Sequence, residues 1–309
     1  MANIAITGVT GKTGMYFLEF LIKDKKYCKQ NEFAFITGSK KKADKLQNLP
    51  MTKIIAVGDV TDKEFLDSFF KEKHYDTLLH IAGTRLTPLL SRAAVEHGVK
   101  RLILVHTTGI YSKYKRAAQV YVEKEAELRK FIKGKGVTLT ILRPTMIYGN
   151  LEDKNVSQFI RMVDKLRIFP VVNGARYELQ PVHARDLGKA YYSVLLQPEV
   201  TANKEYTLSG GEPIMLIDML KVMGRYLKVK NVFVSIPFWF AYLGACVFYG
   251  VSFGKMDYRE KVQRLCEPRT FSYEKAAEDF GYSPMSFPEG VKEEIEMYLQ
   301  QKKTARSSS

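Results

Sequence analysis

The chain has 309 residues, of which 46% are hydrophobic and 12% aromatic, enough to bury the core of one large or two small domains. This composition excludes disordered, collagen-like and disulfide-scaffold proteins. Forty-eight Lys and Arg against thirty-three Asp and Glu leave a net charge of +15, which favours anionic partners without naming one. The three cysteines (Cys28, Cys246, Cys266) show no metal-ligand spacing, and the start MANIAITG resembles no export signal. We therefore expect a cytoplasmic protein without a metal site.

Short apolar runs alternate with amphipathic helical stretches from residue 1 to about 150. Continuous Val, Ile and Leu runs are typical of parallel strands that are covered on both faces. The expected strands are 3–7, 33–37, 53–57, 77–81, 101–106 and 138–142. The expected helices between them include 14–21, 63–70, 89–97 and 117–132. Right-handed crossovers between such strands predict an α/β fold with a doubly wound parallel Rossmann sheet.

The rhythm changes after Gly149, where a helix at 156–166, a strand or loop at 177–182 and a helix at 186–196 are expected. This mixture indicates a smaller C-terminal substrate lobe. We predict a first domain with the parallel sheet at 1–150, with 183–205 packing back on it. The substrate lobe would comprise 151–182 and 206–300. Residues 301–309 are polar and aperiodic, so a disordered tail is expected there.

A glycine-rich loop, TGVTGKTG at residues 7–14, separates the first strand from the first helix. Gly8 would permit a tight turn, Gly11 would let the backbone approach a pyrophosphate, and Gly14 would let the helix pack closely on its strand. The helix N-terminus adds free N–H donors and the positive end of its dipole. The loop therefore predicts dinucleotide binding, against the alternative of a turn without a ligand. The contacts expected here are Gly8, Thr10, Gly11, Lys12, Thr13 and Gly14.

The end of the second strand indicates which dinucleotide is preferred. An NAD site would place a carboxylate there to bind the ribose 2′-hydroxyl, but this chain reads ITGSKKK at 36–42. Ser39 and Lys40 could hold a 2′-phosphate instead, and a bound anion would relieve lysines at a helix N-terminus. The alternative is a solvated charge run. We predict a preference for NADP(H), with NAD(H) as the second choice.

Two further segments fit the same cofactor. Asp59 and Val60 follow the third strand, where Asp59 could reach the adenine amino group. Ala82 and Gly83 follow the fourth strand, near the point where the strand order reverses. Each segment alone is a weak signal, and together they extend the predicted cofactor site.

The order of these segments resembles the extended or atypical short-chain dehydrogenases, in particular the NAD(P)-dependent nucleotide-sugar epimerase and dehydratase group. The resemblance covers about the first 215 residues, and a C-terminal segment (FSYEKAAEDFGYSP, 271–284) extends it. It rests on the glycine loop, GDV at 58–60, HIAG at 80–83, VHTTGIY at 105–111, RPTMIYG at 143–149, PVHARD at 181–186 and YTLSG at 206–210. It implies a Rossmann fold, a small carbonyl or sugar-nucleotide-like substrate, and a cofactor contact at Pro144.

In this family a Ser or Thr, a Tyr and a Lys four residues later carry the acid–base chemistry. The ammonium and the cofactor's charge lower the pKa of the tyrosine, so that it can take a hydroxyl proton. Thr107 matches the hydroxyl position. Aligning residues 126–127 with the family's alanine and glutamate places Gln119 where the tyrosine belongs and Glu123 where the lysine belongs. Neither side chain can perform that proton transfer.

Two Tyr/Lys pairs remain in the cofactor half. Tyr121 lies in the right helix, but Lys124 follows one residue early, whereas Tyr111 and Lys115 are correctly spaced but follow the fifth strand directly. We take Thr107, Tyr121 and Lys124 as the catalytic candidates, with Tyr111 and Lys115 as the alternative. The competing interpretation is a tyrosine packed on a helix face beside a solvated lysine.

The segment 237–254 (PFWFAYLGACVFYGVSFG) carries no charge and holds the only Trp. Eighteen residues make about 27 Å of helix, just short of a bilayer core. We expect a helix packed in the second lobe, because an exposed run of this size favours aggregation. Docking on an anionic membrane through this segment is the less favoured alternative.

Together these observations predict an NADP(H)-binding oxidoreductase or epimerase. The alternative is a non-catalytic NADP(H)-binding redox sensor or regulator, because the Tyr and Lys dyad is not cleanly present. Nucleic-acid binding is not expected, since the lysines are dispersed and no recognition motif accompanies them. An oligomer is compatible with the sequence.

Overall fold

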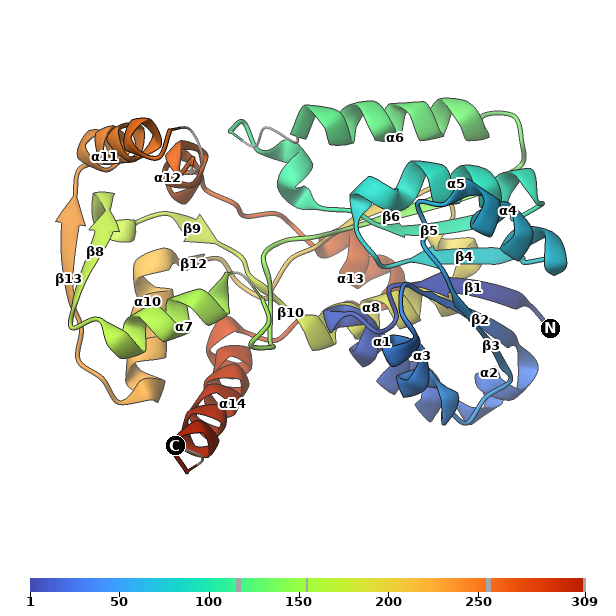
Figure 1. The fold of residues 1–309 in the computed structure, drawn as a ribbon, viewed down its shortest axis with the longest axis horizontal. Coiled ribbons are helices and arrows are strands. Elements are labelled where there is room, and N and C mark those ends of the chain that lie inside the picture. Colours follow the sequence, from blue (N-terminus) through green and yellow to red (C-terminus); the bar gives the residue numbers. More distant parts are fainter. Residues whose placement is uncertain (115–117, 154, 254–256, 308–309) are drawn as a thin grey trace.

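A seven-stranded parallel sheet forms the centre of the larger lobe, in the order β11-β6-β5-β4-β1-β2-β3 (Figure 1). The computed structural model describes residues 1–307 except 115–117, 154 and 254–256. The strands are β1 (Asn3–Thr7), β2 (Glu32–Thr37), β3 (Lys53–Val57), β4 (Thr77–His80), β5 (Arg101–Val105), β6 (Thr138–Pro144) and β11 (Glu205–Leu208). Each of the six predicted strands overlaps one of these, so the predicted doubly wound α/β fold is confirmed.

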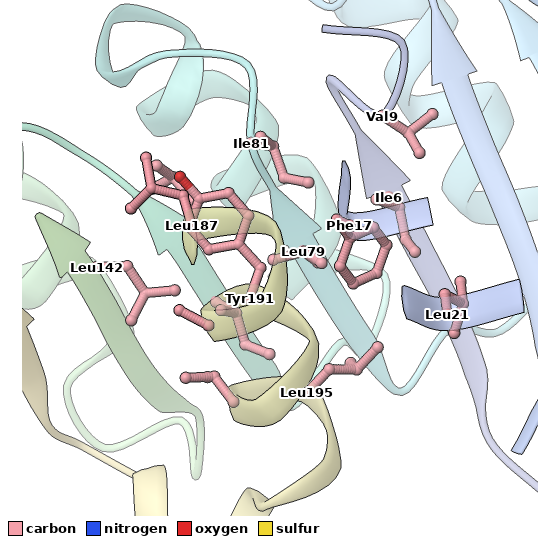
Figure 2. Close-up of a cluster of buried hydrophobic side chains, with 14 of the residues drawn as sticks. Ile6, Val9, Phe17, Leu21, Leu79, Ile81, Leu142, Leu187, Tyr191 and Leu195 are labelled. Carbon is pink, nitrogen blue, oxygen red and sulfur yellow. The ribbon is translucent and has the colours of Figure 1, made fainter. Parts of the chain in front are cut away.

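Helices cover both faces of this sheet because alternate strand residues point to opposite sides. Ile4 and Ile6 of β1 pack into one core, whereas Ala5 belongs to the other. Figure 2 shows the first core, where Phe17 lies beside Ile6 and Leu79. Its helices are α1 (Lys12–Lys23), α2 (Lys25–Gln30), α3 (Lys40–Gln47), α8 (Ala184–Leu196) and α13 (Glu274–Phe280). The second core contains α4 (Lys63–Glu72), α5 (Thr87–Glu96) and α6 (Ala118–Ile132).

The second lobe lies beyond the carboxyl ends of the large sheet (Figure 1). Its core includes Val163, Met219 and Val291, all fully buried. The helices that supply this core are α7 (Val156–Lys165), α10 (Leu216–Leu227) and α14 (Phe287–Ser307). Three two-stranded pairs complete the lobe and its junction: β7 (Ile147–Tyr148) with β10 (Val182–His183), β9 (Glu178–Leu179) with β12 (Ile214–Met215), and β8 (Ile168–Val172) with β13 (Val232–Ile236).

The division between the lobes differs from the expected one. Residues 206–300 were expected in the substrate lobe, but β11 pairs with β6 as the seventh strand of the large sheet. Helix α13 returns to the same sheet, where the rings of Tyr206 and Phe280 meet edge to face with centroids 5.0 Å apart. These two segments join the dinucleotide-binding lobe because its sheet edge at β6 and its first core need cover.

The C-terminal tail also differs from the expectation, because α14 continues to Ser307. The Tyr298 hydroxyl donates a hydrogen bond to the Asp164 carboxylate at 2.8 Å, and the Lys302 ammonium pairs with the same carboxylate. These contacts hold the last turns of α14 against α7. The disordered tail predicted at 301–309 is therefore wrong for 301–307, while 308–309 lie outside the described residues.

Helix α11 (Phe238–Val251) forms where the apolar segment predicts a helix, but it is not packed in a core. Only Ala245 is buried, while Trp239 and Val247 are each 59% exposed and Leu243 is 54% exposed. The prediction of a packed helix is wrong because α11 lies along α12 (Arg259–Leu265) at the outside of the second lobe instead of between other elements (Figure 1). Within the described part of the chain, no helix is long and apolar enough to cross a membrane.

Candidate active site

The glycine-rich loop forms a tight cradle after β1. Gly8 has φ +78°, a left-handed conformation that favours glycine, and a Cβ there would lie 2.6 Å from the backbone nitrogen of Ala82. A Cβ at Gly14 would lie 2.3 Å from the Gly8 carbonyl oxygen. The Gly11 N–H donates to that same carbonyl at 2.9 Å, which closes the turn. The sequence folds this way locally because only hydrogen fits at Gly8 and Gly14.

Helix α1 begins directly after Gly11, with no side-chain cap and no acidic residue in its first turn. Its first N–H groups are therefore left for an anion. A cavity of about 500 Å³ lies beside the loop. It is lined by Gly8, Thr10, Gly11, Lys12 and Thr13, together with Lys42, Ile81, Ala82, Ile147, Asp153 and Asn155. The backbone cradle, the open helix end and the cationic side chains fit the pyrophosphate of a dinucleotide.

The end of β2 carries lysines but no acid. Ser39 precedes α3 without capping it through its side chain, and the first turn of α3 contains no Asp or Glu. Lys42, rather than the predicted Lys40, lines the cavity beside the glycine loop. The signal for Lys42 was present in the sequence as the third lysine of the run.

Asp59 and Val60 have local structural partners after β3. The Asp59 carboxylate accepts the Thr61 N–H at 2.8 Å, and this hydrogen bond holds the pKa of the exposed carboxyl below its ordinary value. Val60 packs against the second core. A contact of either residue with the cofactor stays a prediction.

A second cavity, of about 570 Å³, lies at the carboxyl ends of β4, β5 and β6. The predicted residues Ala82, Gly83, Thr107, Tyr121 and Pro144 all line it. The other residues that line this cavity are Thr84, Arg85, Leu86, His106, Thr145 and Ile147. Ala82 and Ile147 also line the cavity beside the glycine loop, so the two cavities adjoin.

The catalytic candidates separate in space. Nearly buried Tyr121 reaches the second cavity from α6, but Lys124 is not among the residues that line it. The side chains at the aligned dyad positions lie on the exposed surface of α6, where the Gln119 amide donates to the Glu123 carboxylate at 3.1 Å. Tyr111 is 53% exposed and lines a third cavity instead. Lys115 lies outside the described residues.

A buried ionic network lies directly behind the second cavity. The Glu125 carboxylate is 2.6 Å from Nδ1 of His106 and accepts two hydrogen bonds from the Arg143 guanidinium, each 2.6 Å long. Burial raises the pKa of Glu125, but the hydrogen bonds from Arg143 and His106 outweigh it and lower that pKa to about 2. Glu125 is therefore ionised and holds the imidazole. Nε2 of His106 is buried and has no hydrogen-bond partner among the described residues.

The third cavity, of about 700 Å³, separates the two lobes. Thr107 and Thr145 line both this cavity and the second one. Its opposite wall carries Arg264 and Arg269, whose Nε atoms are buried without a hydrogen-bond partner in the described ranges. Burial, followed by the charge of Arg264, lowers the pKa of Arg269 to about 10. Two guanidinium groups with buried unpaired donors make this wall suited to an anion.

A comparison with protein families bears directly on this arrangement. The model of the family described as NAD(P)H-binding matches residues 8–166, just over half of the chain. The chain belongs to the NAD(P)H-binding family. The match begins at Gly8 of the cradle and extends past the residues that line the second cavity.

Known relatives of this NAD(P)H-binding protein are similar over most of its length. The UDP-glucose 4-epimerase of Vibrio cholerae is 23% identical over 247 residues, which cover 74% of this chain and 73% of that protein. Among solved structures, the Thermotoga maritima UDP-glucose 4-epimerase with UDP-glucose gives a TM-score of 0.71 at 16% identity, covering 97% of this chain and 99% of that one. The Bacillus cereus UDP-glucuronic acid 4-epimerase with UDP-glucuronic acid and NAD gives 0.72 at 14% identity, with the same coverage. These findings confirm the resemblance to the extended short-chain dehydrogenase fold.

Sequence reasoning missed three features of this NAD(P)H-binding protein. His106 stood next to the predicted Thr107, but no pattern linked it to Glu125, nineteen residues later. Arg264 and Arg269 reach the third cavity only because the chain returns after α11. The burial of these two arginines gives no signal in the sequence, where they look like ordinary solvated charges. The third feature is Lys42, which did have a signal as the last lysine of the run at 40–42.

Proposed function

We propose that the chain is an NADP(H)-dependent oxidoreductase or epimerase that acts on a sugar-nucleotide-like or other carbonyl substrate. The observation that carries this proposal is a row of three adjoining cavities. Ala82 and Ile147 line both the cavity beside the glycine loop and the second cavity, and Thr107 lines both the second cavity and the third, which holds the two arginines. In Rossmann folds a dinucleotide binds where the strand order reverses, here between β1 and β4. The cavity beside the glycine loop and the second cavity both adjoin that point.

The cofactor would be held by the glycine loop, by Lys12 and by the lysines that open α3. Lys42 lines the cavity beside the loop. The first turn of α3 contains no carboxylate, which would repel a 2′-phosphate. These features support NADP(H) over NAD(H). When bound, the nicotinamide would accept or supply a hydride.

Thr107 and Tyr121 are the proposed proton-handling pair, because both line the second cavity. A hydroxyl proton would pass from the substrate to Tyr121 as a substrate alcohol is oxidised, and return on reduction. Lys124 follows one turn later on the partly exposed side of α6. Tyr111 with Lys115 remains the alternative pair.

His106 is a second candidate for the same proton transfer. Its Nδ1 faces an ionised carboxylate, which fixes the imidazole as a carboxylate does in hydrolase triads, and its Nε2 is left without a partner at the wall of the second cavity. A neutral imidazole carries one protonated and one free ring nitrogen, so it can both take and return a proton. His106 would thus supply the chemistry that Gln119 and Glu123 cannot.

The substrate would occupy the third cavity. Arg264 and Arg269 would bind its anionic part, and Thr107 and Thr145 would face its reacting end. The UDP-sugars of the similar solved structures carry a diphosphate of this kind, so we extend that chemistry to this chain.

Incubation of the purified chain with NADP(H) and a panel of UDP-sugars and ketones tests the enzymatic function. We expect either a change in NADPH absorbance or conversion of a UDP-sugar to an epimer. Arg269→Ala should raise KM for the substrate while leaving NADPH affinity unchanged. Cofactor binding with no conversion of any compound would instead favour the non-catalytic redox sensor.

A titration with both cofactors tests the preference. We expect tighter binding of NADPH than of NADH, and Lys42→Ala should remove most of that difference. Lys45→Ala is the matched control, because Lys45 lies in the last turn of the same helix. Equal affinities in the unaltered chain would contradict the preference, and an equal loss from Lys45→Ala would point to general charge.

Two substitutions separate the proton-handling candidates. If Tyr121 is the acid–base group, Tyr121→Phe should lower turnover by at least about 10²-fold with little change in cofactor affinity. If His106 takes that part, His106→Gln should cause the loss of turnover, while Tyr121→Phe should leave turnover largely unchanged. Tyr111→Phe is the control, and a loss confined to it would restore the alternative pair.

A further inference from the structure

Helix α11 presents an unusually apolar surface outside both cores. Trp239, Leu243, Val247 and Val251 follow one another at four-residue spacing and are each at least 54% exposed. Residues four apart lie on one face of a helix, so these four form a continuous stripe. We call this stripe, together with neighbouring Phe240, the α11 face. Phe240 is 52% exposed, and its ring stacks on the Trp239 ring with centroids 3.5 Å apart.

The α11 helix is apolar around its whole circumference and not only on this stripe. Phe248, on another side, is 45% exposed, and Ala245 is the helix's one buried residue. A helix that is hydrophobic all round is normally surrounded by a protein core or by lipid. The side of α11 that carries Tyr242, Ala245 and Tyr249 is buried or half-buried against the protein itself, so the exposed arc from Trp239 to Phe248 is what needs cover. Shallow immersion in the outer part of a bilayer covers this arc.

We propose that α11 docks the protein on an anionic lipid bilayer. No residue between 231 and 253 is charged, so no charge needs to be desolvated when α11 enters the interface. The chain as a whole carries a net charge of +15, which anionic lipid attracts. Fourteen residues make about 21 Å of helix, which suits a helix lying in the interface and not one crossing it.

The position of α11 connects this surface with the candidate active site. α11 packs along α12, which ends in residues that line the 700 Å³ cavity (Figure 1). Docking would therefore bring that cavity close to the lipid surface. The docking proposal itself does not depend on the proposed catalytic function and can fail or succeed separately.

The single tryptophan gives the experiment a built-in reporter. The full chain is titrated with phosphatidylglycerol/phosphatidylcholine vesicles while Trp239 emission and sedimentation with the vesicles are followed. We expect a blue shift of the emission as Trp239 leaves water, together with binding that added salt weakens. Leu243→Ala combined with Val247→Ala should lower vesicle binding by at least about tenfold, since two exposed apolar side chains no longer enter lipid.

Leu196→Ala combined with Val200→Ala is the matched control. It removes the same pair of residue types from exposed positions, 37% and 39%, on the other lobe. Unchanged melting temperatures would show that both double variants fold. No blue shift and no sedimentation at low salt, or an equal loss in the control, would overturn the proposal. So would lipid-independent self-association that buries Trp239, because a second copy would then cover the α11 face. Equal binding to pure phosphatidylcholine would refute the anionic preference.

Discussion

Glu125→Gln tests the buried network behind the second cavity. The substitution keeps the size of the side chain but removes the charge that pairs with Arg143 and orients His106. The side chains of Glu125 and Arg143 are only 7% and 4% exposed, and two hydrogen bonds of 2.6 Å join them. Removing one partner of such a buried pair costs about 3–5 kcal/mol, because the other charge stays buried. Arg143 keeps Glu205 at 2.7 Å, so we expect the lower end of this range.

Proton linkage gives an independent magnitude. Glu125 has an ordinary pKa of 4.5 and a folded pKa of about 2, so its ionised form stabilises the folded chain by about 3 kcal/mol at neutral pH. Because the folded pKa is depressed, this stability is present above pH 4.5 and is lost as the pH falls towards 2. The difference between the unaltered chain and Glu125→Gln should shrink over the same interval.

Urea unfolding at pH 7 and at several acidic pH values measures both effects. Glu127→Gln is the control, because Glu127 lies on the same helix in a surface pair with Arg92 at 2.6 Å, its side chain 53% exposed. That change should cost no more than about 1 kcal/mol. A cost below about 1 kcal/mol for Glu125→Gln, or a difference that does not shrink on acidification, would refute the reasoning.

Three further changes have defined outcomes. Gly14→Ala should weaken cofactor binding and lower the melting temperature, since its Cβ would lie 2.3 Å from the Gly8 carbonyl oxygen. Gly38→Ala is the control and should do neither, because no atom lies within 4 Å of a Cβ there. Equal effects of the two substitutions would contradict the proposed role of the loop. Burial raises the pKa of Glu294 to about 9, so stability should fall as the pH rises from 4.5 to 9, and Glu294→Gln should flatten that dependence in thermal melts. Tyr298→Phe should speed amide exchange at the end of α14 through loss of its hydrogen bond to Asp164, and unchanged exchange would argue against that anchor.

The sequence by itself determined the dinucleotide-binding half. Strands β1, β2, β4 and β5 are buried on both faces, so they consist almost wholly of apolar residues, and these continuous apolar runs identify them in the sequence. The cradle was equally predictable, because Gly8 and Gly14 occupy positions where only a hydrogen fits between β1 and α1. Such local constraints are written in neighbouring residues.

Only the tertiary structure decided which side chains meet at the cavities and where α11 lies. His106 reaches Glu125 and Arg143 because β5, α6 and β6 are adjacent in the sheet and its covering layer, which spacing along the chain does not reveal. The return of β11 and α13 to the large sheet also depends on tertiary structure, because β11 pairs with the free edge of β6 and α13 covers part of the first core. For α11, apolarity predicted burial, but burial requires neighbours on every side, and among the described residues the helix that packs along α11 is α12. The hydrophobic pattern shows that a segment avoids water, whereas the packing of the whole chain decides whether other protein elements cover that segment.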